Sequence, residues 1–199
     1  MANDIIITPG TEDQGGSTDS APLLKTGQTT CYDTDGYEIP CTGSGQDGEY
    51  GQNVAWPNPR FNDNGNGTVT DNLTGLVWLK KADNPAMDWE AALNFANELA
   101  DPDSGLSDGS TAGDWRLPNR FELGSLLDLE YAGPALCNTA GTEQWQEGDS
   151  FTGVRSNAYW SSSTLTRNGK RGWYVSLRTG DAYHLRKRAR RGVWPVRDA

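Results

Sequence analysis

The sequence contains one histidine, three cysteines and no long apolar run. The histidine is His184, and no cysteine follows Cys137. A nucleophilic serine elbow, a glycine-rich phosphate loop and a His/Cys metal pair are also missing from the sequence. A transmembrane helix would need roughly 18 consecutive apolar residues, so none is predicted. These absences disfavour an enzyme and favour a binding protein.

The first residues do not resemble a secretory signal peptide. Asp4 is acidic, and the apolar patch is limited to the isoleucines at 5–7. The sequence leaves open whether a removed signal preceded Met1 or the protein is made without one.

Large aromatic side chains compensate for a lean apolar content. Only 35% of the residues are hydrophobic, but eight are tryptophan, and each buries a large apolar area. The 24 glycines and 10 prolines predict abundant turns. The length of 199 residues fits one sizeable domain. We expect a ligand-binding domain over 51–199, preceded by an extended N-terminal arm over 1–50.

Charge is divided unevenly along the chain. The net charge is −10, but residues 1–150 carry 25 acids and 6 bases, whereas residues 151–199 carry 2 acids and 11 bases. Residues 1–150 therefore carry a net charge of −19, and residues 151–199 carry a net charge of +9. Either they neutralise each other within one fold, or the basic end attracts a polyanion.

Cys31 and Cys41 bracket the short segment YDTDGYEIP. In an exported protein we expect them to form a disulfide that closes a small loop within the arm. Zinc is not expected, because two cysteines and one distant histidine do not supply four ligands at a usual spacing. Cys137 is then left as a free thiol, in the core or in a loop.

Acidic residues crowd the same segment. Asp33, Asp35 and Glu38 form a D-x-D-G-x-E pattern, and Asp47 follows in GQDGE. Oxygen ligands that alternate around a glycine turn suit Ca²⁺, so these four carboxylates are candidate calcium ligands. An Asx turn with solvated carboxylates explains the same residues, and both interpretations stay open.

Two amphipathic segments predict helices. The first spans 88–100 behind an aspartate cap and carries a Trp/Leu stripe. The second spans 119–130, where Asn119 and Glu122 form a capping box. Phe121 lies beside the leucines of this segment, so we expect one apolar face that is buried.

Short alternating segments predict antiparallel strands, with Asn-Gly and Thr-Gly turns between them. These strands are expected at 68–70, 76–79, 158–163, 172–178, 182–187 and 193–197. The segment over 131–157 has little regular pattern and predicts a long loop, which is either functional or mobile.

Several of these segments resemble the Lcl C-terminal domain family, named after a Legionella collagen-like adhesin. The matching segments are DNGNGTVTDNLTGLVWLK, WRLPNRFELGSLLD, YWSSS and VWPVR, in the expected order over 56–197. The resemblance implies an α+β, C-type-lectin-like fold with two helices packed on small antiparallel sheets and long loops. It also implies an extracellular or cell-surface adhesin that recognises sulfated glycosaminoglycans, often as a homotrimer.

A weaker resemblance is to formylglycine-generating enzymes, through the Arg116-Leu117-Pro118 step followed by Glu122. Those enzymes rely on two cysteines near the C-terminal end. This chain has none there, so we do not expect that enzymatic activity. The chain also lacks Glu-Pro-Asn and Gln-Pro-Asp motifs, which disfavours calcium-dependent sugar binding of the lectin type.

Basic and aromatic residues alternate in a short stretch near the C-terminus. Guanidinium groups bind sulfate, phosphate or carboxylate in a bidentate manner, and aromatic faces stack on sugar rings or bases. We therefore expect an anionic glycan or a protein receptor there, whereas the pI of 4.5 disfavours nucleic acid. The candidate ligand-binding residues are Arg167, Lys170, Arg171, Tyr174, Arg178, Tyr183, His184, Arg186, Arg188 and Arg190.

Two alternatives stay open for this stretch. The arginines could form a solvated sheet edge whose charges pair with acids elsewhere in the chain. The resemblance also allows a variable target protein of a diversity-generating retroelement. In that case YWSSS, WYVSL and VWPVR would frame exposed variable positions.

Overall fold

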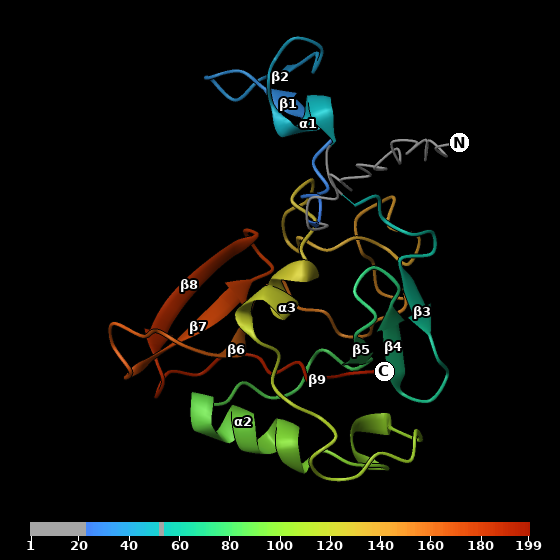
Figure 1. Cartoon of the computed structure of the whole chain (residues 1–199), viewed down its shortest axis with the longest axis vertical. Coiled ribbons are helices and arrows are strands. Elements are labelled where there is room, and N and C mark those ends of the chain that lie inside the picture. The colour runs from blue at the N-terminus through green and yellow to red at the C-terminus, as the bar shows by residue number, and fades with distance from the viewer. Residues whose placement is uncertain (1–22, 52–53) are drawn as a thin grey trace, which may run out of the picture.

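The computed structural model describes residues 23–51 and 54–199, which form three small antiparallel sheets and three α-helices (Figure 1). The predicted α+β class is confirmed, and its C-type-lectin-like assignment stays a prediction. In chain order the elements are β1 Cys31–Tyr32, β2 Glu38–Ile39, α1 Asp47–Tyr50, β3 Phe61–Asp63, β4 Thr68–Asp71, β5 Val77–Leu79, α2 Trp89–Glu98, the short 3₁₀ helix η1 Asp103–Gly105, α3 Arg120–Ser125, β6 Ala158–Thr164, β7 Arg171–Ser176, β8 Asp181–Arg186 and β9 Val196–Arg197.

The four-stranded sheet has the order β3-β4-β5-β9, so the last strand of the chain pairs with an early one. β9 is shorter than the predicted segment, because Pro195 has no amide proton to donate to a neighbouring strand. The β3–β4 hairpin turns through Gly67, whose φ of 84° favours glycine. A Cβ there would lie 2.4 Å from the Gly105 carbonyl oxygen, so the turn also requires glycine for close packing.

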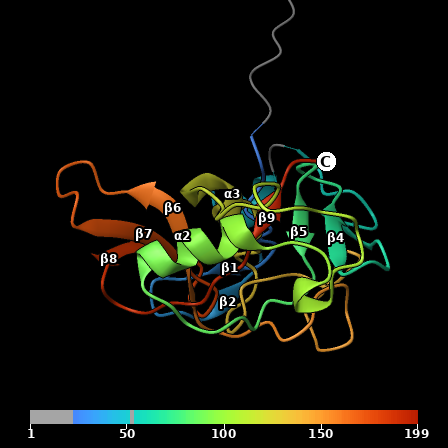
Figure 2. The same cartoon turned by 90° about the horizontal axis from the view of Figure 1, so that it is seen from below.

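The three-stranded sheet β6-β7-β8 lies between two helices (Figures 1 and 2). On one face, Trp160 of β6 and Tyr174 of β7 pack in a cluster with Ala92 of α2. On the other face, the Arg120 guanidinium of α3 lies 4.2 Å from the centroid of the Trp173 ring. Alternate residues of β7 therefore face different helices, and both faces of the sheet are partly covered.

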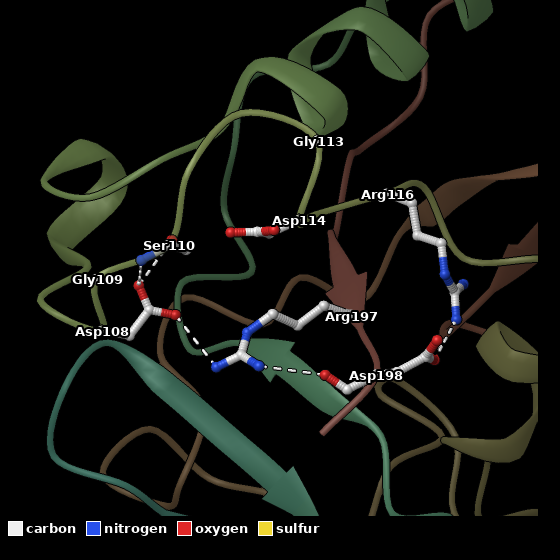
Figure 3. Close-up of a pocket in the computed structure, with 8 residues that line it drawn as sticks. All are labelled: Asp108, Gly109, Ser110, Gly113, Asp114, Arg116, Arg197 and Asp198. Atoms are coloured by element: carbon white, nitrogen blue, oxygen red, sulfur yellow. Dashed lines mark hydrogen bonds and ion pairs between the residues drawn. The ribbon is translucent and has the colours of Figure 1, made fainter.

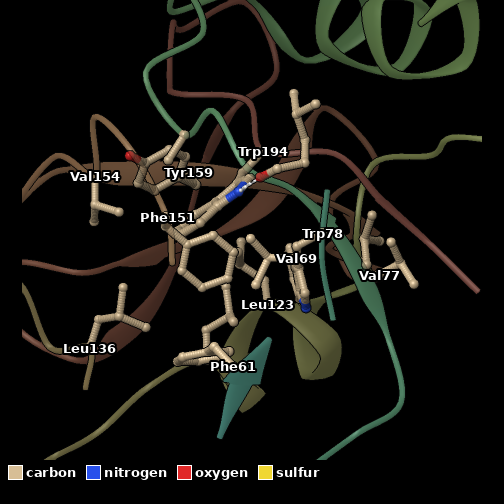
Figure 4. Close-up of a cluster of buried hydrophobic side chains, with 14 of the residues drawn as sticks. Phe61, Val69, Val77, Trp78, Leu123, Leu136, Phe151, Val154, Tyr159 and Trp194 are labelled. Atoms are coloured by element: carbon tan, nitrogen blue, oxygen red, sulfur yellow. Dashed lines mark hydrogen bonds between the residues drawn. The ribbon is translucent and has the colours of Figure 1, made fainter. Parts of the chain in front are cut away.

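Aromatic rings fill the main core (Figure 4). The centroid of Trp194 lies 4.9 Å from that of Phe151, 5.4 Å from Tyr159 and 5.8 Å from Trp78. The indole N–H of Trp194 donates to the Leu79 carbonyl at 2.8 Å, so this buried polar group is satisfied. Large aromatic rings thus supply much of the buried apolar area, although the chain contains few hydrophobic residues.

Both predicted helices are present, but the second is shorter than expected. α2 begins after Asp88, whose side chain caps the first turn. α3 has the predicted capping box, yet it ends at Ser125. The reason is tertiary, because the Asp128 amide donates to the Ala135 carbonyl and not to a carbonyl of the helix. Phe121 is not buried with the leucines, since 81% of it is exposed.

The predicted disulfide joins Cys31 and Cys41, and Cys137 is a buried free thiol. The disulfide closes the β1–β2 hairpin, which projects with α1 from the rest of the molecule (Figure 1). Glu130 holds this part to the body by accepting the Thr29 amide at 2.7 Å. The predicted arm before residue 23 lies outside the described residues, and the boundary at residue 50 stays a prediction. No helix in the described ranges is long and apolar enough to cross a membrane.

Candidate functional site

A cleft of about 580 Å³, here called the basic cleft, opens at the end of β7 and β8 that lies away from their connecting turn. Arg171 begins β7, Arg186 ends β8, and the two residues are direct partners across the strands. A backbone hydrogen bond also joins the chain just beyond these two strand ends, because the Lys187 amide donates to the Lys170 carbonyl at 3.0 Å. The lining residues are Glu90, Asn168, Lys170, Arg171, Arg186, Lys187 and Arg188.

Acids of the described residues do not form ion pairs with the cations of the basic cleft. Five cations line it against one carboxylate, that of Glu90. Within the described chain, none of the five forms an ion pair with a carboxylate oxygen at 4.0 Å or less. Arg171 and Arg186 stand directly opposite each other, and like charges in that position destabilise a sheet. An anion bound between them would relieve this repulsion.

Aromatic and imidazole rings orient several of these cations. The Lys187 ammonium lies 3.7 Å from the centroid of the Trp89 ring. Arg171 Nη1 lies 3.2 Å from His184 Nδ1, and Arg167 Nη2 lies 3.5 Å from His184 Nε2. An imidazole ring accepts through at most one nitrogen, so at most one of the two contacts is an ordinary hydrogen bond. The rings therefore position the cations without cancelling their charge.

The structure brings six of the ten predicted ligand-binding residues together. Lys170, Arg171, Arg186 and Arg188 line the basic cleft, and Arg167 and His184 adjoin it through contacts with each other and with Arg171.

The other four predicted residues lie elsewhere. Tyr174 packs on the α2 face of the sheet, and Tyr183 lies beside it, with ring centroids 6.0 Å apart. Arg178 follows β7 and precedes β8, at the far end of the hairpin. Arg190 donates to the Ala86 carbonyl at 2.6 Å, which anchors the segment after β8. None of these four lines the basic cleft.

Three lining residues were not in the predicted set. Lys187 belongs to the same basic stretch, so its neighbours in the sequence could have indicated it. Asn168 lies in the β6–β7 turn, and Glu90 lies in the first turn of α2. Only the folded chain brings Glu90 to the hairpin, and no local pattern indicates that contact.

The proposed calcium ligands do not converge on one point. Asp33 Oδ1 accepts the amides of Asp35 and Tyr37, which is an Asx turn. In the part of the chain that the structure describes, no three His, Cys, Asp or Glu side chains are arranged to hold a metal ion. The Asx turn accounts for Asp33, and the assignment of Asp33, Asp35, Glu38 and Asp47 as calcium ligands stays a prediction.

A second cavity, of about 460 Å³, lies between β9 and the loop before α3 (Figure 3). Its charges are largely paired: Arg197 lies 3.3 Å from Asp108, and Arg116 lies 2.8 Å from Asp198. Hydrogen bonds from its own loop lower the pKa of Asp114. Because opposite charges meet within this cavity, it is a weaker anion site than the basic cleft.

Comparison with known proteins matches most of the described chain to one family. No curated protein matches the sequence. The model of the Lcl C-terminal domain matches residues 67–197, which include β4 to β9 and every residue that lines the basic cleft. This region covers more than half of the 199 residues. The chain therefore belongs to the Lcl C-terminal domain family.

Proposed function

We propose that the protein is a non-catalytic, adhesin-like surface module that binds an anionic glycan in the basic cleft. The observation that carries the proposal is the group of five cations without ion-pair partners among the described residues. Family membership and the Cys31–Cys41 disulfide support an extracellular or cell-surface location. The homotrimer stays a prediction of the resemblance.

The chemistry of the basic cleft suits anionic groups attached at intervals to one ligand. Guanidinium forks grip sulfate or carboxylate in a bidentate manner, and ammonium groups act as point charges. An acidic glycan presents such groups along its chain and can meet several cations at once. A protein receptor with an acidic patch is the alternative partner.

The proposal is of a binding protein and not of an enzyme. The described ranges hold no group of three or more His, Cys, Asp or Glu side chains suited to a metal ion. His184 is the single histidine, and both of its ring nitrogens face arginine guanidinium groups. We therefore include the absence of catalysis in the proposal.

Replacing both Arg186 and Arg188 with serine tests the basic cleft. Heparin binding should weaken at least tenfold, a loss of about 1.4 kcal/mol. The melting temperature should stay nearly unchanged or rise, because neither arginine has an ion-pair partner in the described chain and Arg186 faces Arg171. Isothermal titration and thermal melts measure the two effects.

Two single variants add a matched control. Arg186→Ser removes one charge from the basic cleft, and Arg178→Ser removes the same charge from the far end of the hairpin. Arg178→Ser should retain most of the affinity for heparin. Heparin binding by the wild type should fall steeply as the salt concentration rises. An equal loss in the two single variants would show that general charge, and not the basic cleft, attracts heparin. If heparin does not bind at low salt, the glycan proposal is wrong and a protein receptor becomes the leading candidate.

A further inference from the structure

Aromatic and cationic side chains continue from the basic cleft across β7 and β8 to α3. We call this set the β7–α3 row: Arg171, His184, Trp173, Arg120 and Phe121. Arg171 contacts His184 at 3.2 Å, and the His184 and Trp173 ring centroids are 5.3 Å apart. The Arg120 guanidinium then lies 4.2 Å from the Trp173 centroid and 5.6 Å from the Phe121 centroid.

Phe121 is the open ring of this row. It is 81% exposed, whereas Trp173 is half-buried under Arg120 and against the edge of His184. A single exposed apolar side chain is normal on a folded surface, so the exposure of Phe121 indicates a ligand only together with the cationic and aromatic side chains beside it.

The backbone at Phe121 is held in place before any ligand arrives. Its amide donates to Asn119 Oδ1 at 2.8 Å, within the capping box of α3. The Arg120 amide donates to the Ser163 hydroxyl of β6 at 3.0 Å, which fastens the start of the helix to the sheet. The backbone that carries this ring therefore loses little conformational entropy when a ligand binds.

The row and the basic cleft share Arg171 but differ in chemistry. The basic cleft offers only charged and polar groups, whereas Phe121 offers an aromatic face that packs against the C–H face of a sugar ring. A sulfated or carboxylated face would lose hydration against this ring without gaining a partner. An uncharged sugar suits the Phe121 ring best, while the charged groups of its neighbours reach Arg120 and the basic cleft.

We propose that the β7–α3 row is a stacking subsite for an acidic polysaccharide in which charged sugars alternate with uncharged ones. This inference rests on the proposed glycan function and narrows its ligand class. A uniformly sulfated polymer fills the basic cleft alone and gains nothing from Phe121. Single-stranded nucleic acid fits less well, because such binders stack successive bases on several open rings.

Hyaluronan and dextran sulfate are the two probes, since one alternates carboxylated and uncharged sugars and the other is sulfated on nearly every ring. Phe121→Ala should weaken hyaluronan binding at least fivefold and dextran sulfate binding less than twofold. Phe121→Tyr keeps the ring and should retain hyaluronan binding. The double replacement of Arg186 and Arg188 with serine should weaken both. Thermal melts check that every variant folds, as expected for so exposed a side chain.

The outcomes separate the two proposals. If Phe121→Ala changes both polymers equally or neither, while the double arginine variant weakens both, the stacking subsite is wrong and the basic cleft stands. If the wild type binds neither of these polymers nor heparin, both proposals are wrong. Binding to single-stranded DNA that depends on Phe121, without binding to hyaluronan, would overturn the choice of a glycan.

Discussion

Replacing Asp128 with asparagine should stabilise the protein at neutral pH. Asp128 is only 3% exposed, and burial raises the pKa of its carboxyl from 3.8 to about 6. A difference of that size corresponds to about 3 kcal/mol by which ionisation of Asp128 destabilises the folded state near pH 7. Asparagine has nearly the same shape and keeps an oxygen to accept the Glu130 amide, but it carries no charge.

The direction of the pH dependence follows from proton linkage. The folded state holds the Asp128 proton more tightly than the unfolded state, so this contribution to stability is complete below about pH 4 and lost as the pH rises through about 6. The hydrogen bond from the Glu130 amide, Arg60 and Lys25 favour the carboxylate, and the charge of the Glu130 side chain opposes it. Burial acts to raise the pKa of Glu130, but hydrogen bonds led by the Thr29 amide outweigh burial and lower it. Glu130 therefore contributes in the opposite sense, and its contribution is lost as the pH falls.

Denaturant unfolding of the wild type and Asp128→Asn from about pH 4 to 8 measures the effect. The variant should gain in free energy of unfolding relative to the wild type as the pH rises, approaching about 3 kcal/mol near pH 7. Burial also raises the pKa of Asp71, although Arg60 lies 3.6 Å away, but Asp71 is common to both proteins. The reasoning would be refuted if the difference in free energy of unfolding between the two proteins did not change with pH. It would also be refuted if the variant were less stable than the wild type at pH 7.

Two further predictions concern the core. Leu126→Asp places a charge at a fully buried position and should destabilise the protein by several kcal/mol, whereas Phe121→Asp on the exposed side of the same segment should change the melting temperature little. Burial raises the pKa of the Cys137 thiol to about 11, so this thiol should react slowly with a disulfide reagent in the folded protein. After unfolding without reductant, one thiol should react, and a count of three would contradict the disulfide.

Local sequence signals predicted the elements whose causes are local. The capping box of α3 and the turns between β6, β7 and β8 depend on residues within a few positions of each other. The end of α3 and the exposure of Phe121 were not predictable in this way. The hydrogen bond from the Asp128 amide to the Ala135 carbonyl ends the helix, and that bond exists only in the folded chain. The predicted loop over 131–157 likewise packs Leu136 and Phe151 into the core, although it has no periodic pattern.

The candidate site could likewise be predicted only in part from the local sequence. A stretch of basic residues indicates that positive charge gathers near the C-terminus, but not which end of a hairpin holds each residue. A six-residue strand spans about 20 Å, which separates Arg178 from Arg171 although only a few residues lie between them. Glu90 and Phe121 come from distant elements, and only the helices on either side of the β6-β7-β8 sheet bring them near the hairpin.

The uneven charge along the chain had two interpretations, and the ion pairs favour one of them. Of the 11 bases over 151–199, Arg155 and Arg197 pair with acids of the described chain, and the other nine do not. Internal neutralisation would require those nine to face carboxylates. Lys187 instead lies over Trp89, and Arg191 lies over Tyr174, at 3.7 and 4.8 Å from the ring centroids. An aromatic ring fixes a cation but leaves its charge to act on the surroundings. The basic segment therefore keeps a local positive charge that the described acids do not pair with, and this charge supports the proposed binding of an anion.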